Sequence, residues 1–235
     1  MHKEKHTLSG KYIKPIVYGG VDGIITTFAI VSSSIGAGLD QKIILIMGVG
    51  NLVADAFSMG MGNYISNKSE YDYIKQERDR ELDEVNTVLD KEKKEMTDIY
   101  EEKGFTAEDA SIIINIMTKP EHKDFFVDHM MIQELELMPL DTYNNFIFDA
   151  LITLLSFMFF GSIPLFAFIL FDELLNNNAA FGIACLITSI TLFLLGSLQS
   201  KFSNKPWYIS GLFVTGNGII ACSIAYLIGY GLDKL

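Results

Sequence analysis

Residues 43–66 read IILIMGVGNLVADAFSMGMGNYIS, and the chain continues directly into NKSEYDYIKQERDREL at residues 67–82. The first part is apolar and long enough for a helix that crosses a bilayer, which takes about 20 residues. The second part is strongly charged, yet it contains neither proline nor glycine, the residues that most often end a helix. The junction therefore predicts one continuous helix that leaves the membrane and enters water.

The net charge lies entirely in the segment that follows the second span. The chain has 235 residues and a formal net charge of −11, and residues 67–145 alone hold 21 acidic and 10 basic residues. The rest of the chain is electrically balanced and contains nearly all the apolar runs. This distribution excludes a soluble single-domain enzyme, and the lack of a basic surface argues against nucleic-acid binding.

Five stretches are long and apolar enough to span a bilayer: residues 15–38, 43–66, 146–171, 179–198 and 207–232. We therefore expect an all-α integral membrane protein with five transmembrane helices and an acidic insert between helices two and three. The expected parts are an N-terminal tail (1–14), helices one and two (15–66), the insert (67–145) and helices three to five (146–235).

The positive charges predict the orientation, because basic residues are enriched on the cytosolic side of membrane proteins. With five spans, the N-terminal tail, the insert and the loop before the fifth span lie on one side, and together they hold 16 of the 18 basic residues. Only Lys42 and Lys234 fall on the other side. The N-terminus and the insert are thus expected in the cytosol.

Two acidic residues fall well inside predicted spans, where an ionisable side chain costs roughly 2.5–3.5 kcal/mol. Asp22 lies in the glycine-rich segment YGGVDG of the first span, and glycine permits close approach of backbone or ligand. Asn51, Asp55 and Met59 recur every four residues in the second span and share one helix face. This face is suited to a cation pathway, and the alternative is hydrogen bonding between helices with methionine as filler. A third acid, Asp149, is expected at the membrane interface.

Cysteine and histidine give no sign of a metal site. Cys185 and Cys222 both fall inside predicted spans and are expected to be small buried side chains. The four histidines show no ligand spacing.

The acidic insert reads as three helices. The first covers residues 67–103 and ends before Gly104, the second opens at Thr106 with a capping box, and the third runs from Pro120 to about Leu137. Four glutamates of the first helix fall within an arc of roughly 80° beside its apolar face: Glu81, Glu84, Glu92 and Glu95.

The third helix adds thioethers to these carboxylates. Met130 and Met131 lie one turn before Glu134, so the three side chains can converge. Carboxylate together with thioether favours a transition metal over Ca²⁺ or Mg²⁺. The alternative is a solvated glutamate face, balanced by nearby lysines, next to methionines that fill a core.

Taken together, these motifs resemble the vacuolar iron transporter family of plants, fungi and protists. The most specific matches are GVDGIITTFA at residues 20–29 and SMGMGNY at 58–64. Lys68-Ser69-Glu70 and the Met130-Met131-x-x-Glu134 element also follow at the family's spacing. The likeness covers nearly the whole chain, although the later spans match only in character.

The resemblance implies a homodimer with its ion pathway at the subunit interface and a cytosolic three-helix metal-binding domain. It implies exchange of Fe²⁺ for protons, from the cytosol into an acidic store, with the pathway residues Asp22 and Met59. It implies a cytosolic metal site built from the glutamates and methionines named above. One departure is Asn51, where the family typically has glutamate; we hypothesise that Asp55, one turn later, replaces that carboxylate.

The expected function is therefore proton-coupled transport of Fe²⁺ across the membrane of the vacuole or another endomembrane compartment, such as the endoplasmic reticulum. Mn²⁺, Co²⁺ or Zn²⁺ could use the same ligands, and no prosthetic group is expected. The alternative is a membrane-anchored metal buffer or sensor that does not transport. A di-iron oxidase is not expected, because its Glu-x-x-His pairs are absent: Lys119 and Phe126 precede His122 and His129 by three residues.

Overall fold

The computed structural model describes residues 9–138, 145–172, 177–202 and 205–235. All regular secondary structure in these ranges is helical, which confirms the all-α prediction. The chain divides into two compact units. The first comprises Met1–Tyr64 with Asn145–Leu235, and the second Ile65–Asn144.

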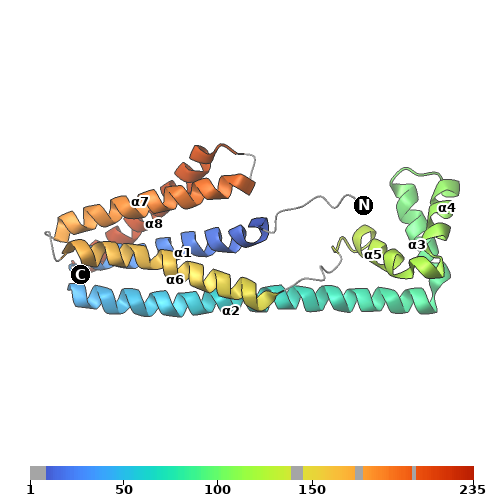
Figure 1. Cartoon of the computed structure of the whole chain (residues 1–235), viewed down its shortest axis with the longest axis horizontal. Coiled ribbons are helices and arrows are strands. Elements are labelled where there is room, and N and C mark those ends of the chain that lie inside the picture. The colour runs from blue at the N-terminus through green and yellow to red at the C-terminus, as the bar shows by residue number, and fades with distance from the viewer. Residues whose placement is uncertain (1–8, 139–144, 173–176, 203–204) are drawn as a thin grey trace. The chain divides into compact units, whose positions relative to one another are not determined.

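The first unit contains the five expected spans. They lie in helices α1 (Ser9–Gly36), α2 (Gln41–Thr87), α6 (Phe146–Asp172), α7 (Asn177–Gln199) and α8 (Trp207–Leu232), with a 3₁₀ turn, η2, at Ser200–Phe202. Helices α1, α6, α7 and α8 pack together as a bundle, with α1 against each of the other three (Figure 1). The prediction of five membrane-spanning helices is confirmed by length and composition.

Glycines set how closely the helices of this bundle approach. A Cβ atom placed on Gly19 would lie 2.8 Å from the carbonyl oxygen of Thr153, and one on Gly23 would lie 2.5 Å from that of Phe157. The glycines around Asp22 therefore accommodate the backbone of α6, as small residues do between membrane helices. The close approach of backbone that these glycines permit is thus observed at Gly19 and Gly23, whereas Gly20 lies against the side chain of Phe160.

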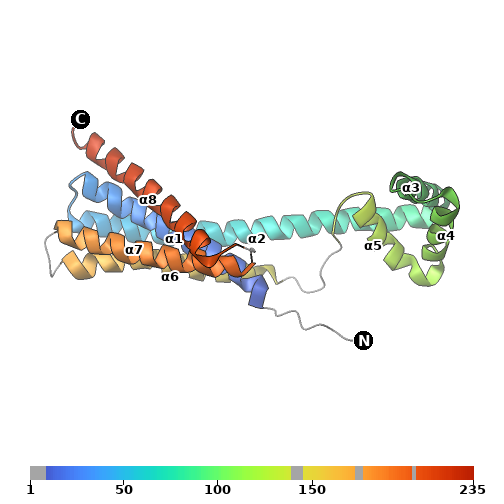
Figure 2. The same ribbon diagram turned by 90° about the horizontal axis from the view of Figure 1, so that it is seen from above.

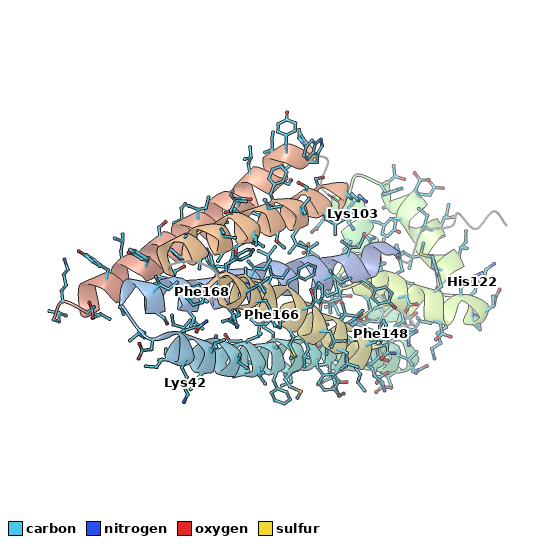
Figure 3. The ribbon with its side chains drawn as sticks, turned by 60° about the vertical axis from the view of Figure 1, so that its left-hand side comes forward. Lys42, Lys103, His122, Phe148, Phe166 and Phe168 are labelled. Carbon is cyan, nitrogen blue, oxygen red and sulfur yellow. The ribbon has the colours of Figure 1, made fainter. Side chains whose placement is uncertain are left out.

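Each membrane helix has an inward and an outward face. On α6, Phe168 is 1% exposed and Phe166 is 68% exposed (both labelled in Figure 3). Phe168 belongs to a core cluster with Phe28 and Phe157, whereas the outward side chains form the apolar surface that a lipid environment requires.

Helix α2 has two distinct faces, one packed against α6 and one exposed. Gly48 and Gly60 lie against Leu165 and Leu154 of α6. Another row of small residues, Gly50, Ala54, Ser58 and Gly62, recurs every four positions and is exposed. A Cβ placed on Gly50 or Gly62 would meet nothing within 4 Å. We call these four residues the small-residue row.

The second unit is built from the C-terminal part of α2 with three further helices and a 3₁₀ turn. They are α3 (Leu89–Glu102), α4 (Ala107–Met117), η1 (Pro120–His122) and α5 (Lys123–Gln133). Figures 1 and 2 show them gathered around the end of α2. The predicted stop at Gly104, with φ +97°, and the cap at Thr106, whose Oγ1 accepts from the Asp109 N–H at 3.2 Å, are confirmed.

The prediction of a single helix over residues 67–103 is wrong. The helix breaks at Val88, whose φ and ψ are −135° and 37°, and α3 starts as a separate helix at Leu89. The third predicted helix is also shorter, because α5 ends at Gln133 and Glu136 has a positive φ of 55°.

The physical reason for the break is the core that it makes possible. In one continuous helix, Val85 and Met96 would be separated by about 16 Å along the axis, at about 1.5 Å per residue. In the structure both are buried in the same cluster as Phe126 and Met130. Burial of this shared apolar surface favours the folded-back arrangement over helix continuity.

Candidate metal centre

The break at Val88 also turns a row of glutamates into a cluster. Glu81 lies near the end of α2, Glu92 in the first turns of α3, and Glu134 at the C-cap of α5. One carboxylate oxygen of each lies within 4.8 Å of the other two. Eleven residues of continuous helix would have kept Glu81 and Glu92 about 16 Å apart. We call these three residues the glutamate cluster.

The cluster is buried, and several of its carboxylate oxygens have no hydrogen-bond donor. Glu81 and Glu92 are each 1% exposed, and Glu134 is half-buried. Three of the oxygens have no hydrogen-bond partner: Oε2 of Glu81, Oε1 of Glu92 and Oε2 of Glu134. Leaving a buried polar atom unsatisfied costs about 1–3 kcal/mol, and more if it is charged. A cation would supply the missing interactions.

Burial and mutual repulsion disfavour the charged forms of these acids. Desolvation raises the pKa of Glu81, and the charge of Glu84 adds to the effect. Desolvation likewise raises the pKa of Glu92. Glu134 is affected most: desolvation, followed by repulsion from Glu81 and Glu95, raises its pKa to about 7. Near neutral pH a metal ion and a proton therefore compete for this carboxylate.

Two further predicted glutamates lie at the edge of the cluster. The side chains of Glu84 and Glu95 are 35% and 42% exposed, and their charges raise the pKa of Glu134. Their charges add to the negative potential around the buried oxygens, and metal coordination by Glu84 or Glu95 stays a prediction.

The methionines divide into two environments. Met130 is fully buried and belongs to the apolar core with Val85, Met96 and Phe126. Met131 is also fully buried, and its carbonyl oxygen accepts from the N–H of Leu137 at 2.8 Å. The structure thus gives Met130 a packing role, and thioether coordination by Met130 or Met131 stays a prediction.

In the membrane unit, the predicted pathway residues are partly buried. The side-chain amide of Asn51 donates a hydrogen bond to Asp55 Oδ2, so these two residues form a pair. Asp22 on α1 lies close enough to Asp55 for their charges to interact. Met59 packs against the bundle core. The structure therefore brings Asp22 near Asp55 and joins Asp55 to Asn51.

Sequence reasoning missed a polar contact on the same face of α2, one helical turn after Met59. Asn63 Nδ2 donates to Thr153 Oγ1 of α6 at 3.1 Å, which links α2 to the bundle. Its signal was present, because Asn63 continues the four-residue spacing of Asn51, Asp55 and Met59.

Two basic residues lie beside the glutamates: sequence reasoning included Lys91 among the lysines that could pair with them, but it missed Arg80. Arg80 contacts the carboxylates of Glu81 and Glu84, and Lys91 contacts those of Glu92 and Glu95. The adjacency and the i, i+4 spacing were visible signals. The nearby lysines had been regarded as a general balance of charge.

The donor set fits a divalent metal ion. Three convergent carboxylates, two of them almost fully buried, provide anionic oxygen ligands at a site that the fold has already formed. Oxygen ligands of this kind suit Mg²⁺, Ca²⁺, Mn²⁺ and Fe²⁺. Such a cluster is suited to holding and releasing a cation. These three residues include no pair of nucleophile and base that would indicate covalent chemistry.

Comparison with known proteins finds relatives over nearly the whole chain. A profile of the VIT family matches residues 13–230. The chain is 42% identical over 234 residues to a protein of Toxoplasma gondii named vacuolar iron transporter, covering 97% of this chain and 77% of that relative. It is 38% identical to the vacuolar iron transporter of Plasmodium berghei, covering 97% and 85%. It is 28% identical to vacuolar iron transporter 1 of Arabidopsis thaliana, covering 96% and 88%.

Proposed function

Because the chain belongs to the VIT family, we propose that it transports iron, moving Fe²⁺ from the cytosol into an acidic compartment in exchange for protons. Its relatives in Toxoplasma gondii and Plasmodium berghei are named vacuolar iron transporters. The compartment proposed is the vacuole or another acidic endomembrane store. Mn²⁺, Co²⁺ and Zn²⁺ are candidate substrates for the same ligands.

The observation that carries this proposal is the pairing of two carboxylate sites in one chain. The glutamate cluster is the proposed cation site of the second unit, and Asp22 with Asp55 places acidic groups inside the membrane unit. A protein that only anchored a metal-binding domain would have no need for acids within its spans, where each is costly. Transport gives both sets of carboxylates a role.

Proton coupling follows from the chemistry of the same side chains. A carboxylate that faces an acidic lumen takes up a proton and loses much of its attraction for Fe²⁺, so proton entry releases the metal. In the cytosol the carboxylate loses the proton and can bind the next ion. Asp22 and Asp55 are the proposed carriers of this exchange, with Met59 as a soft ligand beside them and Asn51 orienting Asp55 through their hydrogen bond.

We further propose that the chain works as a homodimer, with the small-residue row of α2 against a second copy. The row is exposed, and Gly50 and Gly62 have open space around them, whereas Gly48 and Gly60 of the same helix are already packed against α6. Small residues at four-residue spacing let two membrane helices approach closely. Asn51 and Asp55 each lie next to a member of this row, so the two sets of acids would come near each other.

The proposal is tested by metal uptake into proteoliposomes that contain the purified protein, with and without an acidic interior. We expect uptake of Fe²⁺ that rises with the pH gradient, falls strongly in Asp22→Ala and loses its pH dependence in Asp55→Asn. Asp149→Asn, which changes an acid in the first turn of α6, is the matched control. Uptake no greater than in protein-free liposomes would refute transport and leave the anchored metal buffer, whereas uptake that ignores both the gradient and Asp22→Ala would refute the proton-coupled pathway.

A further inference from the structure

The glutamate cluster carries its own positive charges. Two basic side chains reach its carboxylates from opposite sides of the break at Val88: Arg80 from α2 and Lys91 from α3. We propose that these two residues are exchangeable counter-ions, which a divalent metal displaces and which thereby set the metal affinity of the cluster. This inference rests on the metal site of the proposed function.

Arg80 serves three carboxylates at once. Its guanidinium nitrogens lie 3.1 Å from Glu77 Oε2, 3.5 Å from Glu81 Oε1 and 3.5 Å from Glu84 Oε1. Five N–H donors in a planar fork allow such sharing, but none of these contacts reaches the second oxygen of Glu81. That oxygen, Oε2, remains without a hydrogen-bond partner.

Lys91 makes the corresponding contacts on α3. Its Nζ lies 3.6 Å from Glu92 Oε1 and 3.7 Å from Glu95 Oε2. Both separations are longer than the 2.7–2.9 Å of a charge-assisted hydrogen bond. Glu92 Oε1 is also without a hydrogen-bond partner. Lys91 therefore offsets the negative charge of Glu92 without satisfying its buried oxygen.

These contacts differ from an ion pair in the same unit that holds the fold together. Arg78 Nε lies 2.7 Å from Asp128 Oδ1, which links α2 to α5, and the Arg78 side chain is only 26% exposed. The side chains of Arg80 and Lys91 are 55% and 67% exposed. Long contacts with the cluster and open solvent on one side let both cations leave the cluster carboxylates at little cost, and Arg80 keeps its 3.1 Å contact with Glu77.

Displacement follows from charge and geometry. A divalent ion held by the three convergent oxygens would contact each of them directly, whereas Arg80 and Lys91 stay at 3.5 Å or more from the cluster oxygens. The metal gains the stronger interaction but must overcome the attraction of both basic groups. Their presence therefore lowers the affinity, which helps a transporter that must release its substrate.

The test is a Co²⁺ titration of the purified full-length protein by isothermal calorimetry at pH 8. We expect Lys91→Gln and Arg80→Gln each to bind Co²⁺ about two- to fivefold more tightly, the range expected for losing an exposed ion pair. Lys93→Gln is the matched control, because Lys93 lies on the same helix and its Nζ donates to Asn115 Oδ1 at 3.3 Å. Lys91→Arg, which keeps the charge, is expected to bind like the unmodified protein.

The outcomes separate this inference from the proposed site. If Lys91→Gln and Arg80→Gln bind no more tightly than Lys93→Gln, the two residues are not counter-ions that the metal displaces. If the double variant Glu81→Gln/Glu92→Gln binds Co²⁺ as well as the unmodified protein, the glutamate cluster itself is not a metal site. If Lys91→Gln and Arg80→Gln bind Co²⁺ more tightly, and this binding is lost when Glu81→Gln/Glu92→Gln is added, the result supports both the counter-ions and the metal site.

Discussion

Replacing Glu134 by glutamine is expected to stabilise the metal-free second unit at neutral pH and to weaken its response to metal. The pKa of Glu134 is raised from 4.5 to about 7. As the pH rises through 4.5, the unfolded chain loses this proton while the folded chain retains it. Stability is therefore lost between pH 4.5 and pH 7, and it stays at the lower value above pH 7.

The size of this loss follows from the shift. At about 1.4 kcal/mol per pH unit the full shift corresponds to about 3 kcal/mol. Glu134 is only half-buried, and screening by solvent reduces the effect to about 1–2 kcal/mol. Glutamine has nearly the same shape and carries no charge, so Glu134→Gln should recover this amount at pH 8 and change little at pH 4.5.

The measurement is hydrogen–deuterium exchange of the α3 and α5 amides in the full-length protein, which reports the local free energy of opening. Glu136→Gln, at an exposed glutamate two residues away, is the control. Addition of Co²⁺ should make the unmodified protein more stable than Glu134→Gln. Metal at 100 times its dissociation constant adds about 2.7 kcal/mol to the stability of a chain that binds it. The reasoning would be refuted if Glu134→Gln followed the unmodified protein at every pH, or if Co²⁺ protected both equally.

Two further predictions concern the membrane unit. Gly23→Ala should destabilise the packing of α1 against α6 by about 1–3 kcal/mol, since its Cβ would lie 2.5 Å from Phe157 O. Gly50→Ala, which meets no atom within 4 Å, should be tolerated, and thermal unfolding in detergent compares the two. Gly62→Leu should shift the protein from dimer to monomer in light scattering, whereas Gly216→Leu, equally open on α8, should leave the dimer intact. If Gly62→Leu remained a dimer, this result would contradict the proposed interface.

The general architecture could be predicted because its signals are local. Runs of apolar residues identify spans one by one, and Gly104 and Thr106 identify a helix end and a helix start from their own chemistry. The small residues of α2 are visible in the sequence, but their division between two faces is not. That division depends on where Leu154 and Leu165 of α6 lie. The spacing of residues within α2 does not show which helix packs against which of its faces.

The break at Val88 could not be predicted, because no residue there forbids a helix. Thr87 and Val88 are β-branched, which lowers helix propensity only slightly. The Thr87 hydroxyl donates to the carbonyl oxygen of Asp83 at 2.8 Å, a contact that often bends a helix without ending it. The decisive contribution comes from Phe126 and Met130, which lie about 40 residues further along the chain and pack against both α2 and α3 residues.

This tertiary break changes what the glutamates can do. On a continuous helix, Glu81 and Glu92 would be two solvated charges about three turns apart, each able to attract a cation and neither able to share it. Folded back, they meet Glu134 with unsatisfied oxygens, an arrangement that disfavours the empty state and favours the metal-bound one. The apolar core of the unit supplies the stability that holds these like charges together. Weakening that core should therefore lower metal affinity even when every glutamate is kept.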